Sequence, residues 1–302
     1  MSSDDVIGQF QHALALDAQR WQAAWQARLQ HHPATIRFDR PFKTLPVSLT
    51  GTSCALNCAH CGGVYLRHMQ PIGEAPLKAE ADGFISCLIS GGCDARGRVP
   101  FAGHLDEVAR LRHGRRLNWH VGMMGEEELR TILPYVDVVS FDLVGDAETA
   151  REVYGLNLTL EDYLRQLDML ERHTRVVPHL TIGLRGGRLS GEWAALEALS
   201  PRAPEALILL ILIPTPGTAY AHCAPPALAE VADLFLGARI LLPTTRLYLG
   251  CMRPRGAYRQ AVDELAVRAG LNGLVNPSHS AERAAQELGL EIIWGEECCA
   301  LG

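Results

Sequence analysis

Three cysteines on one short stretch carry the most specific chemistry in the sequence. Cys54, Cys58 and Cys61 form a C-x3-C-x2-C cluster directly after the apolar, β-prone run at residues 45–49. Three thiolates on one loop can hold three irons of a [4Fe-4S] cube and leave the fourth iron without a protein ligand. The spacing therefore predicts a cluster with one open iron, at which chemistry can take place.

Zinc and disulfides are the alternatives for these cysteines. A structural zinc site normally takes four Cys or His ligands in paired groups, and His60 stands too close to Cys58 and Cys61 to begin a second pair. A disulfide framework is typical of short secreted chains, whereas this one has 302 residues, nine cysteines and a start that does not resemble a signal peptide. The pattern favours the cluster, with zinc as the stronger alternative.

The triplet, with His60 as the aromatic-type residue before the third cysteine, resembles the radical S-adenosylmethionine (radical SAM) superfamily. The resemblance implies that the open iron binds the amino and carboxylate groups of SAM. It also implies that an electron from the cluster cleaves SAM to methionine and a 5'-deoxyadenosyl radical. The protein would then supply binding, orientation and protection, while the cofactor supplies the difficult chemistry.

Composition restricts the remaining classes of function. The chain is 48% hydrophobic and 21% charged, with a formal net charge of -6, as expected for a globular protein. Its one concentrated basic stretch, residues 110–116, fits a solvated helix end, so we expect no nucleic-acid partner. No run approaches the ~20 apolar residues of a membrane span, so we expect no membrane partner, and the many cysteines favour a reducing cytoplasm.

Short apolar runs alternate with helical patterns over most of the chain, which predicts a parallel sheet with helical crossovers. Strands are predicted at 45–50, 84–90, 117–122, 135–142, 176–183, 206–213, 245–250 and 272–276. Helices are predicted at 65–69, 104–113, 125–133, 160–173, 190–199, 226–238, 256–270 and 280–288. We expect an α/β fold, a full or partial (β/α)8 TIM-type barrel spanning residues 41–290.

The two ends of the chain are expected to lie outside this barrel. Residues 1–40 form an N-terminal extension, helical over 5–31 and irregular after Pro33. Residues 291–302 form a cysteine-containing tail that is expected to fold over the barrel mouth. In TIM-type barrels the functional groups lie at the carboxyl ends of the strands, so the residues that follow each strand become site candidates.

Candidate contacts to SAM follow several of these strands. Gly91 and Gly92 allow close backbone approach after the second strand, and the resemblance assigns such a pair to the SAM amino group. Relatives usually carry a Glu next, whereas Cys93 and Asp94 stand here, so either Asp94 or the backbone could meet the ammonium. Asp142, at the end of the fourth strand, could accept hydrogen bonds from ribose hydroxyls or cap the following loop.

The next two strands complete this set. Ile182 resembles the apolar segment that packs on the adenine, and Pro214 begins a Pro-Thr-Pro-Gly-Thr stretch that resembles biotin-synthase-like members. A plain turn would also explain these prolines. His104, His120, His179 and His279 are scattered and are expected to be satisfied by local hydrogen bonds.

A second cysteine set suggests a second cluster. Cys251 follows the seventh strand beside two arginines, and Cys298 and Cys299 are adjacent near the end of the chain. Exposed adjacent cysteines would be an oxidation liability, so we expect them to join Cys251 around an auxiliary iron-sulfur cluster, with Cys93 as a further candidate. Cys87 is expected in the core, and Cys223 is undecided.

The cysteine segments together resemble the two-protein lipoyl synthases of archaea and sulfur-oxidising bacteria, within the biotin-synthase-like branch. In biotin and lipoyl synthases the auxiliary cluster is consumed as the sulfur donor. The resemblance implies sulfur insertion into the octanoyl chain of a lipoyl carrier protein or domain. It also implies a possible sister radical SAM protein and an electron donor such as ferredoxin or flavodoxin. The alternatives are a maturase or mutase of the same superfamily, or a non-catalytic iron-sulfur protein.

Overall fold

The structure is a computed structural model that describes residues 3–302, in which strands and helices alternate along the chain. The chain divides into two units. Unit 1 comprises Met1–Arg40, Leu180–Pro214 and His222–Gly295, and unit 2 comprises Pro41–His179, Thr215–Ala221 and Glu296–Gly302. Each unit has its own sheet region and helices, and each is described separately.

Unit 2 is built on a parallel sheet whose strands were nearly all predicted. They are β2 (Thr44–Ser48), β3 (Gln70–Pro71), β4 (Ser86–Ser90), β5 (Arg116–Val121), β6 (Val138–Asp142) and the first residues of β7 (Val176–Ile182). Their spatial order is β7-β6-β5-β4-β2-β3, which leaves β3 at the edge. The register places Leu45 opposite Cys87 and Cys87 opposite Leu117. All carboxyl ends therefore meet at one end of this sheet.

Alternation along these strands separates two faces of the unit 2 sheet. Thr44 bonds Ser86 at 2.7 Å and Ser140 bonds Asn118 at 2.9 Å, so small polar side chains share one face. Residues between them, such as Trp119, point to the other face, where its indole nitrogen donates to the carbonyl of Tyr135. The face that carries Thr44, Ser86, Asn118 and Ser140 thus has polar side chains that form hydrogen bonds with one another.

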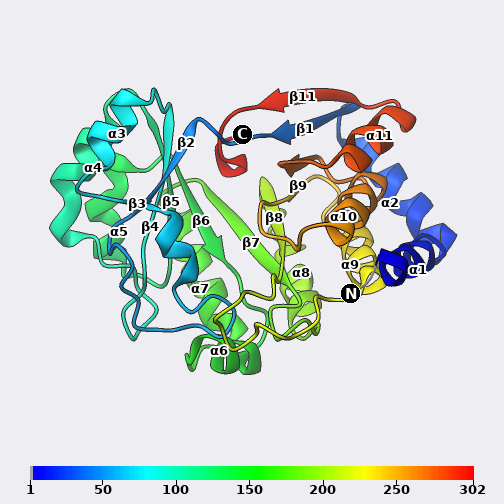
Figure 1. Ribbon diagram of the computed structural model, residues 1–302, viewed down its shortest axis with the longest axis horizontal. Coiled ribbons are helices and arrows are strands. Elements are labelled where there is room, and N and C mark those ends of the chain that lie inside the picture. Colours follow the sequence, from blue (N-terminus) through cyan, green and yellow to red (C-terminus); the bar gives the residue numbers. More distant parts are fainter. Residues whose placement is uncertain (1–2) are drawn as a thin grey trace. The chain divides into compact units, whose positions relative to one another are not determined.

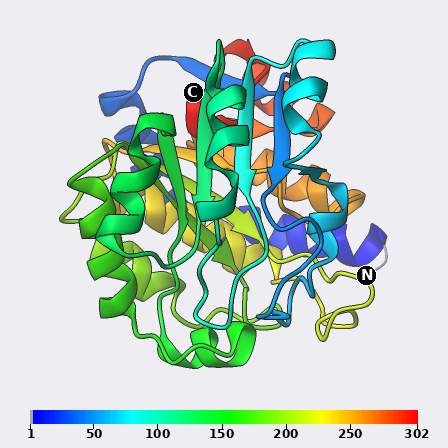
Figure 2. The same cartoon turned by 90° about the vertical axis from the view of Figure 1, so that its left-hand side faces the viewer.

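Five helices accompany the unit 2 strands: α3 (Ala75–Ala81), α4 (Leu105–Arg112), α5 (Glu126–Ile132), α6 (Ala147–Tyr154) and α7 (Leu160–Glu171). Figures 1 and 2 show α3, α4 and α5 lying on the outer side of their strands. The ends of α6 are well specified by sequence, because Asp146 caps its first turn and Gly155 ends it in the left-handed conformation. Short 3-10 turns at η1 (Val64–His68), η2 (Ala102–His104) and η3 (Leu133–Tyr135) connect further elements.

Unit 1 has a second parallel region. Its elements are α1 (Ser3–Leu14), α2 (Ala18–His31), β1 (Thr35–Asp39), α8 (Glu192–Leu199), β8 (Ala206–Ile211), α9 (Leu228–Leu241), β9 (Arg246–Leu249), α10 (Ala257–Arg268), β10 (Gly273–Val275), α11 (His279–Glu287) and β11 (Glu291–Gly295). The strand order is β11-β1-β10-β9-β8, followed by the last residues of β7. β11 is the edge strand of this region, and β8 is buried along nearly its whole length.

All eight predicted strands are confirmed, but the expectation of an irregular approach after Pro33 is wrong. Thr35–Asp39 is β1, which pairs in parallel with both β10 and β11. This strand was not predicted because it contains Arg37 and Asp39, and two charges in five residues argue against a buried strand. They satisfy each other at 2.7 Å, and Asp39 is fully buried. β11 and the short helices α3 and α6 were also missed.

A helix that crosses a bilayer must be about 20 residues long and mostly apolar. Among residues 3–302, no helix is both long and apolar enough to cross a membrane.

Candidate functional site

The three cysteines stand on a tightly wound loop at the carboxyl end of β2. Cys61 donates its backbone N–H to the carbonyl of Cys58 at 3.1 Å, and Gly62 donates to the same carbonyl at 2.9 Å. Asn57 adopts a positive φ of 47° just before Cys58, and Gly62 and Gly63 have positive φ after Cys61. Since Asn and Gly tolerate this conformation best, the residues between the cysteines are those that the turn requires.

Two hydrogen bonds connect the residues after β4 to this loop. Ala55 donates to the carbonyl of Cys93 at 2.7 Å, and the N–H of Gly92 donates to Oγ1 of Thr50 at 2.7 Å. A Cβ atom on Gly92 would lie 2.0 Å from the carbonyl oxygen of Ser53 and 2.6 Å from Cβ of Cys54. Gly92 is therefore required because the two loops touch, backbone against backbone.

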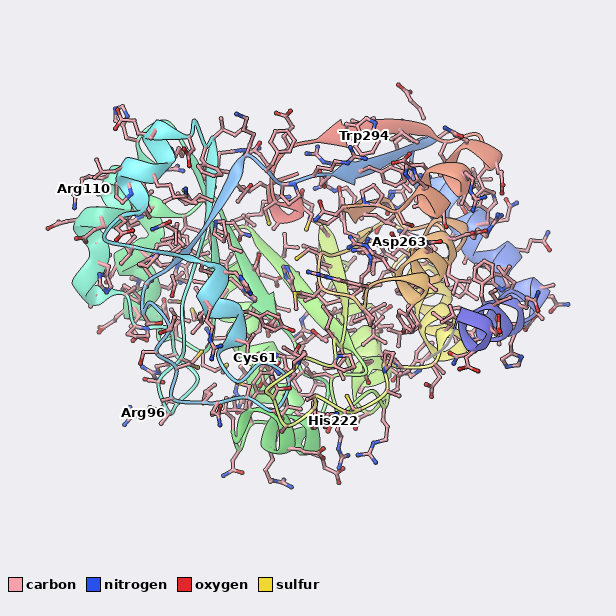
Figure 3. The ribbon with its side chains drawn as sticks, viewed as in Figure 1. Cys61, Arg96, Arg110, His222, Asp263 and Trp294 are labelled. Atoms are coloured by element: carbon pink, nitrogen blue, oxygen red, sulfur yellow. The ribbon has the colours of Figure 1, made fainter. Side chains whose placement is uncertain are left out.

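The loops enclose a cavity of about 280 Å³ whose lining belongs entirely to unit 2. The cysteines on it are Cys54, Cys58, Cys61 and Cys93, and the polar or glycine positions include His60, Ser90, Gly91, Gly92, His120 and Asp142. Apolar and aromatic walls come from Leu66, Met69, Leu88, Val99, Met123, Phe141, Val144, Tyr154, Leu156 and Tyr163. Figure 3 shows Cys61 at the end of unit 2 remote from Arg110. The structure thus brings the predicted triplet, both glycines and Asp142 together.

The Pro-Gly-Thr segment also reaches the cysteine loop through residues of unit 2. Tyr65 and Thr215 share a hydrogen bond of 2.6 Å between their hydroxyls, and Tyr220 donates its N–H to the carbonyl of Ala59 at 3.1 Å. Thr218 lies within van der Waals range of the position a Cβ of Gly62 would take. This segment therefore supports the loop from outside the cavity.

The thiols of the triplet differ in their electrostatic surroundings. Cys58 donates its S–H to Cys61, and this bond lowers the pKa of Cys61 to about 7, against the opposing effect of burial. The same bond and burial raise the pKa of Cys58 well above its usual range. Burial, followed by the nearby charge of Cys54, raises the pKa of Cys93 to about 12. A cation in the cavity would be needed to hold all of these sulfurs as thiolates.

An ion pair forms the wall opposite the cysteines. His120 on β5 lies 3.2 Å from Asp142 on β6 and stacks on His179 of β7, with ring centroids 5.5 Å apart. Burial acts to raise the pKa of Asp142, but His120 outweighs it, and the pKa falls to about 2. Burial likewise opposes the charged form of His120, yet Asp142 keeps its pKa raised. Burial, reinforced by His120, lowers the pKa of His179 to about 4, so this ring is neutral.

The residues present fit the implied cluster and SAM. His60 Nδ1 is buried without a hydrogen-bond partner in the structure, and burial lowers the pKa of His60 to about 4. Among residues 3–302, no three Cys, His, Asp or Glu side chains are grouped closely enough to bind one metal ion. A four-iron cube takes one thiolate per iron and so needs more widely spaced ligands. Cys54, Cys58 and Cys61 line one cavity, and each can supply one thiolate to it.

The C-terminal segment lies at the other end of unit 2. Cys298 donates its N–H to Oγ1 of Thr44, the first residue of β2, at 2.8 Å. Arg116, the first residue of β5, donates to the carbonyl of Leu301 at 2.9 Å, and Arg175, just before β7, donates to that of Ala300 at 3.0 Å. The expectation that the C-terminal tail covers the carboxyl ends of the strands is wrong. These hydrogen bonds hold residues 298–301 at the amino ends of the unit 2 strands, and Figure 1 marks the C-terminus there.

Cys298 points into the interior of unit 2 from that end. Asn118 Nδ2 donates to its sulfur at 3.4 Å. The thiol of Cys299 also donates to it, and this bond, against the effect of burial, lowers the pKa of Cys298 to about 7. Cys299 itself is buried in the short turn η4 (Cys299–Leu301). The pair is thus an ordered part of the unit rather than a frayed end.

The other predicted site residues do not line this cavity. Ile182, Pro214 and Cys251 belong to unit 1, where Ile182 is fully buried and Cys251 is exposed after β9. Asp94 closes its own loop by accepting from the N–H groups of Arg96 and Arg98, and it does not line the cavity. Cys87 is fully buried on β4, as expected.

Sequence reasoning missed His120 and His179, which seemed scattered. The available signal was alternation, because Asn118 and His120 share one face of β5 and Ser140 and Asp142 share one face of β6. Pairing β5 with β6 then places His120 beside this carboxylate. Tyr154 of α6 was missed because that helix was missed; its ring lies edge-on to His60, with centroids 5.6 Å apart.

The chain is similar to known proteins over most of its length. It is 26% identical to the biotin synthase of Bordetella avium over 253 residues, 76% of each chain. It is 25% identical to the biotin synthase of Methylococcus capsulatus over 228 residues, 68% of each chain. No protein-family model matches the chain.

A solved structure of methylornithine synthase extends the comparison to the fold. It matches with a TM-score of 0.62 and 13% identity, over 97% of this chain and 94% of that one. This likeness confirms the expected α/β fold with parallel, TIM-type strands. The similarities to biotin synthases and the cysteine triplet support the radical SAM superfamily and its biotin-synthase-like branch.

Proposed function

We propose that this chain is a biotin-synthase-like radical SAM enzyme in which Cys54, Cys58 and Cys61 hold a [4Fe-4S] cluster. The observation that carries the proposal is that these three thiols share one cavity with Gly91 and Gly92. When bound, the cluster and SAM supply a carbon radical able to remove hydrogen from an unactivated C–H bond.

The residues of unit 2 have distinct roles in this proposal. Gly91 and Gly92 line the cavity where the end of β4 touches the cysteine loop, and their backbone carbonyl groups would accept from the SAM ammonium. Asp142, kept ionised by His120, offers carboxylate oxygens to the ribose hydroxyls of SAM. Apolar and aromatic walls that include Met123 and Tyr154 exclude water, which protects a reactive radical.

The specific reaction we propose is sulfur insertion into a protein-bound octanoyl chain, as in lipoyl synthases. Two observations support it: the biotin synthase relatives, and the ordered pair of Cys298 and Cys299. This pair is our candidate for ligands of an auxiliary cluster that donates sulfur. Because the pair lies at the amino ends of the unit 2 strands, such a cluster would have ligands remote from the carboxyl ends that carry the triplet.

Partners follow from the same proposal. The octanoyl group would arrive on a lipoyl carrier protein or domain, and a sister radical SAM protein could insert the second sulfur. A one-electron donor such as ferredoxin or flavodoxin would reduce the cluster. We further propose that the protein acts in the cytoplasm, where its thiols remain reduced.

Cleavage of SAM tests the coarser proposal. The anaerobically reconstituted protein, reduced with dithionite and given SAM, is expected to release 5'-deoxyadenosine. Cys58→Ala is expected to lower this release at least about 1,000-fold, because the cube loses one of its three ligands. Cys87→Ala, which changes a core cysteine of β4, is the matched control. Wild-type protein that binds iron but forms no 5'-deoxyadenosine would instead indicate a non-catalytic iron-sulfur protein.

Iron and sulfide counts test the auxiliary cluster. Cys298→Ala and Cys299→Ala are each expected to lower both counts by about half relative to wild type, while retaining the absorption of the SAM cluster. Sulfide is expected to disappear from the wild-type protein during one turnover with an octanoylated carrier. Counts that are unchanged in both variants would exclude a second cluster held by these cysteines. A maturase or mutase would cleave SAM without losing sulfide.

A further inference from the structure

A fourth thiol shares the cavity with the cysteine triplet. Cys93 follows Gly92 at the end of β4 and lines the same cavity as Cys54, Cys58 and Cys61. Its carbonyl accepts the N–H of Ala55 at 2.7 Å, so its backbone is held against the residue after Cys54. The proposed function gives this thiol no role.

The contacts around Cys93 fix where its sulfur lies. The neighbouring Gly92 touches the Cys54 backbone so closely that an added Cβ would lie 2.7 Å from Cα of Cys54. The sulfur of Cys93 lies 3.6 Å from the position of an added Cβ on Gly122, which also lines the cavity. Cys54 and Cys61 are both near enough to interact with this sulfur electrostatically. Cys93 therefore lies next to the loop that carries the triplet.

Simple packing does not account for this position. Cys87, six residues earlier on the same strand, is fully buried in the core, as a small apolar residue would be. Cys93 is only partly buried and borders open space. A thiol held beside three others at the edge of a cavity is suited to bind iron.

We infer that Cys93 is a fourth ligand, which binds the open iron of the cluster while SAM is absent and is displaced when SAM binds. The inference rests on the proposed [4Fe-4S] cluster and concerns its resting state. In the exchange, one iron–sulfur bond breaks, and one bond from iron to the SAM nitrogen and one to a SAM carboxylate oxygen form. The proton lost by the SAM ammonium goes to the departing thiolate, and no electron is transferred.

This exchange would keep the cluster from reacting before its substrate is present. Four thiolates leave no iron position open to oxygen or water. The fourth thiolate also adds one negative charge, which disfavours reduction of the cluster. Binding of SAM would therefore open the reactive iron and ease reduction in a single step.

Spectroscopy of the reconstituted full-length protein tests the inference. The variants are Cys93→Ala and Cys93→Ser, with Cys87→Ala as the control on the same strand. Electron paramagnetic resonance spectra of the reduced cluster are compared before and after SAM is added, and the midpoint potential and the Kd for SAM are measured. Circular dichroism checks that each variant is folded, and the serine variant preserves the size of the side chain.

Cys93→Ala is expected to change the spectrum and raise the midpoint potential only in the absence of SAM. With SAM bound, its spectrum is expected to match the wild type. If Cys93 occupies the iron about nine tenths of the time, the variant binds SAM about tenfold more tightly, because the competing ligand is gone. Cys87→Ala is expected to match the wild type throughout.

Two results separate this inference from the proposed function. Identical spectra of wild type and Cys93→Ala before SAM is added, in protein that releases 5'-deoxyadenosine, would overturn the inference alone. Failure of the wild type to assemble a cluster would overturn both. Loss of the cluster in folded Cys93→Ala and Cys93→Ser would instead make Cys93 a permanent ligand, which also contradicts displacement by SAM.

Discussion

Single residues in unit 2 decide whether the cysteine loop and the end of β4 can meet. Gly92 has no room for a side chain, because the backbone of Ser53 and Cys54 occupies that space. Asp142 sits opposite and remains ionised because His120 lies 3.2 Å away. Gly92 thus acts through the absence of a side chain, and Asp142 acts through its negative charge.

Gly92→Ala is expected to move the cysteine loop and lower the iron content of the reconstituted protein to less than about half. Overpacking of this kind usually costs about 1–3 kcal/mol of stability. Gly103→Ala is the control, because nothing lies within 4 Å of a Cβ added there. Iron assay and urea unfolding measure the two effects. Full iron content in Gly92→Ala would show that the loops tolerate separation.

Asp142→Asn is expected to weaken SAM binding by about tenfold or more, since a hydrogen bond to a charged group contributes about 1.5–3 kcal/mol. Loss of the carboxylate also lowers the pKa of His120, whose charged form it stabilises. Asp94→Asn is the matched control, because that carboxylate only closes its own loop. Calorimetric titration with SAM gives the affinities. Equal weakening in both variants would contradict a specific role for Asp142.

At the scale of elements, the direction of the strands determines what each end of unit 2 can do. The cysteine triplet, Gly92 and Asp142 come after strands or at their last residue, so the parallel arrangement gathers them at one end. The C-terminal turn η4 is held at the opposite end by Arg116 and Arg175. Cys298 therefore approaches the interior from the amino ends of the strands.

Arg175→Ala is expected to loosen the C-terminal turn, because Arg175 donates to the carbonyls of Ala300 and Gly302. Loss of these bonds should lower the cost of local opening by about 1–2 kcal/mol, which raises amide exchange there roughly tenfold. Hydrogen exchange with mass spectrometry of the C-terminal peptide measures this. Arg110→Ala is the control, since that side chain is exposed and pairs with Glu107 on its own helix. Unchanged exchange in Arg175→Ala would mean that other contacts hold the turn.

At the scale of the whole molecule, buried and partly buried histidines in both units link stability to pH. The pKa values of His32, His60 and His179 are each lowered to about 4, with burial as the largest cause. In the unfolded chain these imidazoles bind protons below about pH 6.5. Between pH 6.5 and 4 the unfolded state therefore binds more protons, and stability rises with pH in this window. His120, whose pKa is raised, contributes stability that is lost as pH rises above 6.5.

The melting temperature is accordingly expected to be several degrees lower at pH 5 than at pH 7, since each kcal/mol shifts a chain of this size by about 2 °C. His32→Gln should reduce this difference, because Gln can still accept the bond that Arg239 donates to His32 but cannot titrate. Differential scanning calorimetry at the two pH values measures the effect. A higher melting temperature at pH 5 would contradict neutral buried histidines.

The sequence by itself determined the eight central strands and singled out the cysteine triplet for which we propose iron binding. Both are local signals, because continuous apolar runs specify buried parallel strands and ligand spacing along one loop specifies a cluster. β1 was not predicted from the sequence, because Arg37 and Asp39 form an ion pair only once the strand is folded. Local pattern therefore sufficed wherever no distant partner was needed.

Only the tertiary structure decided which residues meet across sequence distance. It paired His120 with Asp142, set Cys93 beside the cysteine loop and placed Cys298 at the amino ends of the strands. Each of these positions depends on strand pairing or on hydrogen bonds between segments far apart in the chain, which residue spacing does not encode. The chemistry proposed for the triplet thus follows from the sequence, whereas the residues that surround the triplet are selected by the fold.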